Sequence, residues 1–574
     1  MIDHLRPLPV SLTDSHGIFI APNLDTRRSV AVLMLRPWGF DELCTRKFFR
    51  RLAEELSQAG IASLRFDYPG TVDALDPREG QSLQNWQSAA LSALDTLHKV
   101  SGADEIIVFG FGLGSVIARQ IANHPLVKGV VHAAPVSNPK RYLREVGLRA
   151  KVVQDGLGLE DAELPNEQTS IAGIVMDPQL AEGLRTFCPP PPANIPTLVV
   201  GREDKASDQK FVAQMKEAGC PVSETAFDGY TQLLEDPTAS VIPDQVLSQI
   251  VDWCVEHSAS ATGNFPLQTN WSTHVSGSGY IEEGVIIEGS APLYGVLCSP
   301  EVSEPDAPAL IFLNSGYDHH GGWARAWVEA SRRRASKGAL CLRADFANIG
   351  DSPPADGEPE QVLYTDGPIK DTSALIDFIR TKTSGPITLV GRCSGAYSAF
   401  QAAFRDDRIA QLLLCNQVRL IWDPEESLTD PTRMGPRSMG DYKKRFGDPK
   451  TLKRLLTGDI SISGVMRGLS SHAVTRISHM IAPVWPNISK HGRFRHECHE
   501  IFKALRARDV SMHFLCSEGD QSLEQLALYF GKDQKGFRSY PNVSLTKLPN
   551  ADHNLTPPAA RETLFGYLEN LIER

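Results

Sequence analysis

The order of the expected elements repeats along the 574-residue chain. An apolar strand followed by a glycine turn occurs at 30–40 ("VAVLMLRPWGF") and again at 309–317 ("ALIFLNSGY"). A strand leading into a glycine-rich turn and a helix occurs at 105–122 ("EIIVFGFGLGSVIARQIA") and at 386–403 ("PITLVGRCSGAYSAFQAA"). Strands of continuous Val, Ile and Leu that alternate with amphipathic helices are typical of parallel sheets covered on both faces. The repeat therefore predicts two α/β domains in tandem, each a mostly parallel sheet flanked by helices.

The two copies are separated by a short polar stretch and differ in length. The stretch "EHSASATGNF" (256–265) is small and polar, as expected of a linker. It predicts a first domain over 1–257, a linker over 258–265 and a second domain over 266–574. The interval from the glycine-rich turn to the following acid is 92 positions in the first copy and 127 in the second. The extra residues predict a larger cap over the second domain, at about 418–505.

Composition excludes several classes of function. A formal net charge of −11 argues against general nucleic-acid binding. The start, "MIDHLRPLPVSL", has no apolar run behind a basic segment, so we expect no secretory signal. No stretch reaches the roughly 18 apolar residues of a membrane helix, so no membrane association is expected. The ten cysteines lack paired spacing, which fits reduced thiols in the cytoplasm.

The second copy contains a nucleophile, an acid and a base in one order along the chain. The turn "GRCSG" (391–395) has the pattern G-x-C-x-G and places Cys393 where an α/β-hydrolase carries its nucleophile. Asp520 follows the apolar strand "MHFLC", and His553 follows the next strand, "VSLTKL". The order nucleophile, acid, histidine is that of α/β-hydrolases. We predict a triad of Cys393, His553 and Asp520, with Glu518 as the alternative acid.

The first copy lacks this chemistry. Its corresponding positions hold Gly112, Asp204 and Tyr230. Glycine offers no nucleophile, and a tyrosine does not accept a proton near neutral pH. The first domain is therefore expected to be catalytically silent and kept for structure or for binding.

Two backbone N–H groups are expected to stabilise an oxyanion in the second copy. One comes from Ser394, the residue after the nucleophile. The other comes from the loop "NSGYDHH", with either Gly316 or Tyr317 as the donor. His319 and His320 follow in the same loop. They either line the entrance to the site or are exposed loop residues.

The expected cap contains a basic run. Lys443, Lys444 and Arg445 lie in "RMGPRSMGDYKKRFGDPKTLKRLLTG", which is either a solvated helix face or a dock for an acidic or phosphate-bearing donor. The histidines of "HGRFRHECHE" (491–500) lack the i, i+4 spacing of a helical zinc site, so no metal is expected. The chain has no phosphate-binding or dinucleotide-binding loop, and no cofactor is predicted.

Parts of the second half resemble known families. "GRCSGAYSAF" shares its G-x-C-x-G turn with dienelactone hydrolases and polyhydroxyalkanoate synthases, which are α/β-hydrolases. Together with "FLNSGYDHHGGWARAWVEASRRRASKGALCLRADFANIGDS" it more closely resembles the hydrolases found beside bacterial exosortase and secondary-metabolite loci. The resemblance covers most of residues 280–574, and the first half shares only the scaffold. It implies the fold, a Cys-His-Asp triad and a place in biosynthesis.

A cysteine nucleophile favours one reaction class. A thiol beside an imidazolium and a helix N-terminus ionises more readily than a free thiol, and its acyl derivative is a thioester. We therefore expect a cysteine-dependent acyltransferase or thioesterase that accepts an acyl group from a carrier protein or coenzyme A. The alternatives are a carboxylic ester or lactone hydrolase of the dienelactone type, and a scaffold in which both domains are inactive.

Overall fold

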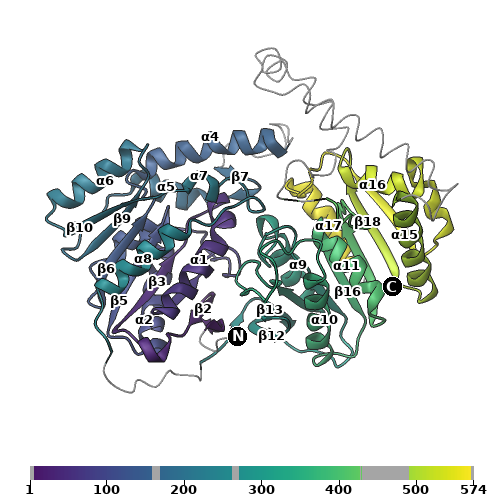
Figure 1. The fold of residues 1–574 in the computed structure, drawn as a ribbon, viewed down its shortest axis with the longest axis horizontal. Helices are drawn as coiled ribbons and strands as arrows, with labels where there is room; N and C mark the ends of the chain where they lie inside the picture. Colours follow the sequence, from purple (N-terminus) through teal and green to yellow (C-terminus); the bar gives the residue numbers. More distant parts are fainter. Residues whose placement is uncertain (1–4, 158–168, 262–270, 427, 429–489, 571–574) are drawn as a thin grey trace, which may run out of the picture.

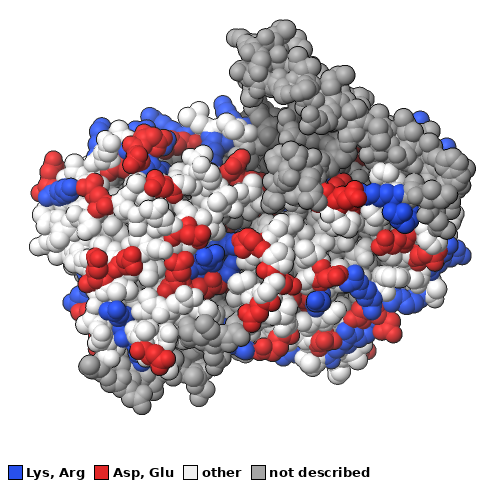
Figure 2. Space-filling model, viewed as in Figure 1, with Lys and Arg blue, Asp and Glu red and all other residues white. Residues whose placement is uncertain are grey.

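The structure is a computed structural model that describes residues 5–157, 169–261, 271–426, 428 and 490–570. Two sheet bodies lie side by side, and we call residues 5–261 the first half and residues 271–570 the second half (Figure 1). On the face in Figure 2, acidic and basic side chains are interspersed over both halves. Among the described residues, every helix is too short or too polar to cross a bilayer.

The first half contains an eight-stranded sheet in the order β1-β2-β4-β3-β5-β6-β9-β10. Strand β2 runs antiparallel to β1 and β4, and the other neighbours are parallel. The strands are β1 (Leu8–Ser11), β2 (His16–Ile20), β3 (Val30–Leu35), β4 (Ala62–Phe66), β5 (Glu105–Phe111), β6 (Val127–Ala133), β9 (Thr197–Gly201) and β10 (Val222–Ala226), with a hairpin of β7 (Ser170–Ile171) and β8 (Ile174–Val175). The helices are α1 (Phe40–Gln58), α2 (Leu83–Ser101), α3 (Gly114–Ile121), α4 (Pro139–Leu157), α5 (Pro178–Thr186), α6 (Ala206–Glu217), α7 (Tyr230–Leu233) and α8 (Asp244–Glu256).

The second half repeats this order in a nine-stranded sheet, β11-β12-β13-β15-β14-β16-β17-β18-β19. Strand β13 is antiparallel to β12 and β15, and from β15 onward neighbouring strands are parallel. The strands are β11 (His274–Ser276), β12 (Tyr280–Glu288), β13 (Pro292–Pro300), β14 (Ala309–Phe312), β15 (Leu340–Ala344), β16 (Ile387–Arg392), β17 (Ile409–Cys415), β18 (Ser511–Ser517) and β19 (Val543–Leu548). The helices are α9 (Ala326–Ala335), α10 (Gly367–Arg380), α11 (Ser394–Arg405), α15 (Lys490–Ala507), α16 (Gln521–Phe530) and α17 (Pro558–Asn570).

This topology is that of two tandem α/β-hydrolase folds, so the predicted fold class is confirmed. The central strands explain the sequence pattern. Every residue of β3 and β14 is buried, because helices cover both faces of each parallel sheet. Most of the predicted cap, residues 427 and 429–489, lies outside the described residues. At its C-terminal end the predicted boundary differs from the structure. Helix α15 begins at Lys490 and buries Cys498, Ile501, Phe502 and Leu505 in the second half's core, so it belongs to the sheet body.

The predicted linker also differs from the structure at its start. The backbone of residues 259–261 pairs with residues 27–29 of the first half. The Ser29 N–H donates to the Ala259 carbonyl at 2.8 Å, and the Ala261 N–H donates to the Arg27 carbonyl at 3.0 Å. The first half therefore extends as ordered chain to at least residue 261.

The two halves contact each other through reciprocal ion pairs. The stretches "LRFDYPGTVD" (64–73) and "LRADFANIGD" (342–351) carry Arg, Asp and Asp at matching positions. Arg65 Nε lies 2.8 Å from Asp351 Oδ1, and Arg343 Nη2 lies 3.2 Å from Asp73 Oδ1. Each arginine thus binds the aspartate that ends the matching stretch of the other half. Such reciprocity is the property of an isologous dimer interface, so the halves pack as two subunits of a symmetric dimer would.

A second cation in each half completes the pattern. Arg46 lies between Asp67 of its own half and Asp351 of the other, at 2.7 and 2.9 Å. His320 likewise lies between Asp345 of its own half and Asp73 of the other, at 2.9 and 2.5 Å. All of these side chains are buried. The junction of the halves is therefore a network of buried ion pairs in which every charge needs its partner.

Candidate active site

Cys393 lies on the sharp turn between β16 and α11. Its backbone has φ 51° and ψ −117°, outside the regions that a residue with a side chain normally occupies. Glycines make the turn possible: a Cβ on Gly391 would lie 2.4 Å from the Gly395 backbone, and one on Gly395 would lie 2.3 Å from the Asn314 carbonyl oxygen. The turn presents Cys393 at the start of α11, where the helix dipole favours a thiolate.

The structure brings the three predicted triad residues together. His553 Nδ1 lies 2.8 Å from Asp520 Oδ2, and the same imidazole is close enough to Cys393 to lower the pKa of its thiol. Asp520 caps α16, and its Oδ1 accepts the Ser522 N–H at 2.8 Å, which fixes the carboxylate. Glu518 is exposed. The carboxylate that orients the imidazole is therefore that of Asp520.

The electrostatics of the three residues favour a charged pair. Burial by itself raises the pKa of the Cys393 thiol, but His553, Arg392 and a hydrogen bond from Tyr364 lower it below its usual value. Burial lowers the pKa of His553, but Cys393 and Asp520 raise it to about 10. The Cys393 thiol therefore ionises more readily than a free thiol, and the His553 imidazole holds its proton more firmly than a free imidazole.

Tyr364 is a site residue that the sequence reasoning missed. It precedes α10, is buried and has φ 62°, and its hydroxyl is one of the groups that lower the pKa of Cys393. Its ring stacks on Trp422 with centroids 4.5 Å apart, and meets Tyr397 edge-on at 5.1 Å. No motif in "QVLYTDG" indicates this role, because only the tertiary fold brings the loop to the nucleophile.

Replacing Tyr364 with phenylalanine is expected to shift the ionisation of Cys393 to higher pH. The Tyr364 hydroxyl is one of the groups that lower the pKa of Cys393, so its loss is expected to raise that pKa. Alkylation of Cys393 by iodoacetamide, followed by peptide mapping between pH 5 and 10, measures the shift. Cys188, which is exposed, gives an internal standard in the same sample. An unchanged profile for Cys393 would contradict the assignment.

The N–H groups predicted to stabilise the oxyanion differ in whether they already donate a hydrogen bond. The Gly316 N–H donates to the Ser394 hydroxyl at 2.8 Å, so the serine next to the nucleophile holds the facing loop. Within the described part of the chain, the N–H groups of Tyr317 and Ser394 donate to no other group. This favours Tyr317 over Gly316 as the second donor.

Arg392 connects the loops around the triad. Its guanidinium donates to Asp318 Oδ2 at 2.5 Å and to the side-chain oxygen of Asn554, the residue after His553. The same guanidinium lies 5.9 Å from the centre of the Trp323 ring. One side chain next to the nucleophile thus joins the turn to two loops: residues 314–323, which we call the oxyanion loop, and residues 549–557, which we call the histidine loop.

Both predictions for His319 and His320 are wrong. The two histidines neither line the entrance to the active site nor are exposed. Both are buried against the first half: His319 Nε2 lies 3.5 Å from Glu42 Oε2, and His320 bridges two aspartates. His319 also lines a cavity of about 450 Å³ between the halves, which Cys393, Asp520 and His553 do not line. The sequence placed both histidines in a loop, and loops are usually exposed.

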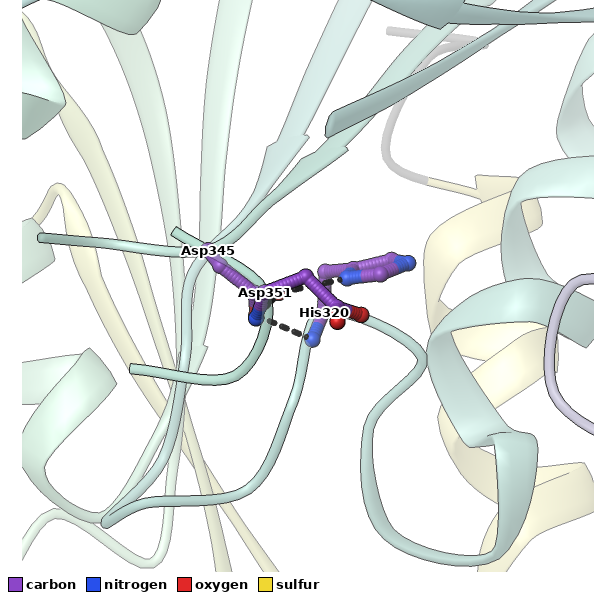
Figure 3. A group of neighbouring side chains, drawn as sticks. All are labelled: His320, Asp345 and Asp351. Carbon is purple, nitrogen blue, oxygen red and sulfur yellow. Dashed lines mark hydrogen bonds and ion pairs between the residues drawn. The ribbon is translucent and has the colours of Figure 1, made fainter. Parts of the chain in front are cut away.

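His320, Asp345 and Asp351 form a compact group that resembles a set of metal ligands (Figure 3). Burial lowers the pKa of His320, but Asp73 and Asp345 raise it to about 10, so both ring nitrogens carry protons at neutral pH. A protonated imidazole offers no lone pair to a metal. Asp351 is already bound by arginines. These residues therefore fit an ion-pair junction better than a metal site.

The first half retains the turn but not the site. Gly112 has φ 53°, close to the value at Cys393. The Tyr230 hydroxyl accepts a hydrogen bond from Arg202 at 3.3 Å, and Arg202 pairs with Asp208 at 2.7 Å. These side chains leave a cavity of about 40 Å³ beside Gly112, which is too small for a substrate. Asp204 is exposed and lies 4.0 Å from Lys205, so it is not the partner of Tyr230.

Replacing Asp204 with asparagine is therefore expected to leave turnover within about a few-fold of wild type, as for most exposed substitutions. Steady-state kinetics on the full chain test this. A specific loss of rate in a folded Asp204→Asn protein would show that the first half takes part in the chemistry.

Lys443, Lys444 and Arg445 lie outside the described residues. Of the "HGRFRHECHE" stretch, Cys498 is buried in the core and His499 hydrogen-bonds the Tyr540 hydroxyl at 2.7 Å. These contacts give the two residues structural roles.

Comparison with known proteins gives local and distant similarities. No family model matches the chain. A segment of 114 residues is 29% identical to the esterase EstD of Thermotoga maritima, and the match spans 18% of this chain and 28% of that esterase. Solved structures align with about half of the chain. The ferulic acid complex of Est1E from Butyrivibrio proteoclasticus aligns with a TM-score of 0.31, 14% identity and coverage of 50% of this chain and 98% of its own. A thioesterase domain from the curacin biosynthetic pathway aligns with a TM-score of 0.29, 14% identity and coverage of 50% and 99%.

Proposed function

We propose that the protein is a cysteine-dependent acyltransferase or thioesterase acting on an activated acyl thioester. The observation that carries the proposal is the pairing of Cys393 with His553, whose imidazole is in turn bound by Asp520. A cysteine of lowered pKa on a strand-to-helix turn, beside a histidine that a carboxylate orients, is the arrangement of a nucleophile that forms covalent acyl intermediates.

The reaction would proceed in two steps. The Cys393 sulfur attacks the thioester carbonyl carbon, and the N–H groups of Ser394 and Tyr317 stabilise the oxyanion. When the carbon–sulfur bond of the donor breaks, His553 gives its proton to the departing thiolate. An acceptor alcohol, amine, thiol or water then attacks the acyl-cysteine while His553 removes the acceptor's proton, and Cys393 leaves as thiolate.

A thioester donor suits this site better than an oxygen ester. Transfer from a donor thioester to Cys393 exchanges one thioester for another, so the first step is close to isoenergetic. The acyl group stays activated for the second step.

The second candidate is hydrolysis of a carboxylic ester or lactone. The local similarity to the esterase EstD favours it, although that match covers only 28% of the esterase. The third candidate is a non-catalytic scaffold.

A panel of donors separates the three candidates. Acetyl-coenzyme A and longer acyl thioesters are compared with p-nitrophenyl esters by intact-mass measurement and by turnover. Acylation by thioesters with slow ester turnover supports the proposal. Rapid turnover of simple esters without a persistent adduct would establish the hydrolase instead, and the absence of any adduct or turnover would establish the scaffold.

We further propose that the donor is carried by an acidic acyl carrier protein or by coenzyme A, and binds at the basic run of residues 431–454. The run has eight basic and two acidic residues, in a chain of net charge −11. Complementary charge raises the encounter rate more than it deepens affinity, and salt screens it over about 8 Å near physiological ionic strength.

Replacing Lys443, Lys444 and Arg445 with glutamate is expected to raise the KM for an acyl carrier protein or coenzyme A thioester several-fold. A small neutral thioester such as an N-acetylcysteamine ester should react at the wild-type rate. Steady-state kinetics with both donors test the prediction. An equal effect on both donors, or on neither, would contradict a docking role.

A further inference from the structure

The catalytically silent first half touches the loops that build the active site of the second half. We propose that it acts as a built-in positioning subunit, which holds the oxyanion loop (residues 314–323) in its reactive geometry. This inference rests on the proposed function, because it concerns the same site. The first half would then contribute to catalysis although it has no nucleophile of its own.

The first contact is at Tyr317, the proposed oxyanion donor. Lys47 of α1 places its ammonium 5.5 Å from the centre of the Tyr317 ring and forms an ion pair with Glu360. The Tyr317 hydroxyl in turn donates to the Glu360 carbonyl at 3.1 Å. Lys47 thus contacts the Tyr317 ring and also Glu360, the residue whose carbonyl accepts the hydrogen bond of the Tyr317 hydroxyl.

The second contact is at Gly316. Thr238 Oγ1 of the first half lies 2.7 Å from the position that a Cβ on Gly316 would occupy. Since Gly316 has φ 57° and donates its N–H to Ser394, a side chain at this position would be strained and would displace the loop. The loop therefore fits closely between Ser394 and the first half.

The third contact reaches Arg392 through Trp323. Trp323 belongs to the second half but is 6% exposed and packs in the hydrophobic core of the first, where its ring meets Phe40 edge-on at 6.3 Å. The Arg392 guanidinium lies over the same ring. A tryptophan anchored in the first half thereby supports the arginine that binds Asp318 and Asn554.

Further contacts fix the ends of the same loops. Asp73 binds His320, and Glu42 lies beside His319. The hairpin turn at Gly173 packs on Thr556, three residues after His553: a Cβ on Gly173 would lie 2.8 Å from Thr556 Cγ2. The first half therefore contacts both the oxyanion loop and the histidine loop. An oxyanion hole acts only when its donors are held in place before the reaction, so these contacts bear on the rate.

Two reactions of the same cysteine test the inference. Acylation of Cys393 by p-nitrophenyl acetate passes through a tetrahedral oxyanion, whereas alkylation by iodoacetamide is a direct displacement that needs no oxyanion hole. Lys47→Met in the full chain is expected to slow acylation roughly 10- to 100-fold, as small misplacements at reacting centres do, and to leave alkylation unchanged. Lys47→Arg should restore acylation, and Thr238→Gly should act in the same direction as Lys47→Met.

Arg51→Met is the matched control, because Arg51 lies on the same helix and pairs with Glu55 and Asp244 within the first half. It should change neither rate. Equal loss of acylation and alkylation in Lys47→Met, or no loss of either, would overturn the positioning role while leaving the proposed function intact. If wild-type Cys393 is alkylated but is acylated by neither p-nitrophenyl acetate nor a thioester, there is no working oxyanion hole, and both proposals are overturned.

Discussion

Replacing Cys393 with alanine is expected to abolish acylation and reduce turnover by at least about 10⁴-fold, since covalent catalysis cannot proceed without its nucleophile. The protein should remain folded. Cys393 is only partly buried, and alanine fits the space that the thiol leaves. Intact-mass measurement after mixing with acyl thioesters, together with circular dichroism, checks both parts of this expectation.

Two control variants sharpen the result. Cys188→Ala removes the exposed cysteine and should leave acylation unchanged. Cys393→Ser keeps a nucleophile but not an easily ionised one, so a slowly formed and slowly hydrolysed oxyester is expected. Full activity in Cys393→Ala, or an adduct that disappears in Cys188→Ala, would contradict the assignment of the nucleophile.

Replacing Asp351 with asparagine is expected to lower the free energy of unfolding by about 3–5 kcal/mol, the usual cost of breaking a buried ion pair from one side. Asp351 is fully buried and pairs with Arg46 at 2.9 Å and Arg65 at 2.8 Å. Burial raises the pKa of Asp351, but Arg36, Arg65 and Arg46 hold it well below its usual range. The stabilisation is therefore present at neutral pH and is lost only as acid protonates the carboxylate. Urea denaturation measures the change.

The reciprocal arrangement supplies a matched pair of variants. Asp73→Asn should destabilise by a similar amount, because Asp73 pairs with Arg343 and His320 as Asp351 pairs with Arg65 and Arg46. Asp377→Asn is the surface control: its partner Arg408 is partly exposed, and surface pairs contribute about 0–1 kcal/mol. Equal midpoints for Asp351→Asn and Asp377→Asn would show that the junction of the halves does not depend on these charges.

Much of the fold follows from local patterns. Continuous apolar strands and the repeated glycine turns depend on residues close in the sequence, so both sheets and the position of Cys393 were predictable. Asp520 and His553 were predictable for a related reason, since the carboxyl ends of parallel strands meet at one edge of a sheet.

The features that could not be predicted depend on contacts between residues that lie far apart in the sequence. His319 and His320 read as ordinary loop residues, and nothing local indicates that Glu42, Asp73 and Asp345 surround them. The role of Tyr364 likewise arises from a loop that crosses to the nucleophile. Helix α15 was assigned to the cap because the interval between Cys393 and Asp520 is long, although the helix covers the sheet. In each case, contacts distant in the sequence decide the outcome.

The most direct test of a thioester-forming Cys393 is to identify the acylated atom. Wild-type protein is mixed with an acyl thioester, quenched in acid within milliseconds to seconds, digested and mapped by mass spectrometry. We expect one acyl group on the peptide that contains Cys393, released by neutral hydroxylamine as a thioester is, and absent in Cys393→Ala. An acyl group on a serine or another cysteine, or an unmodified Cys393 peptide during turnover, would contradict this expectation.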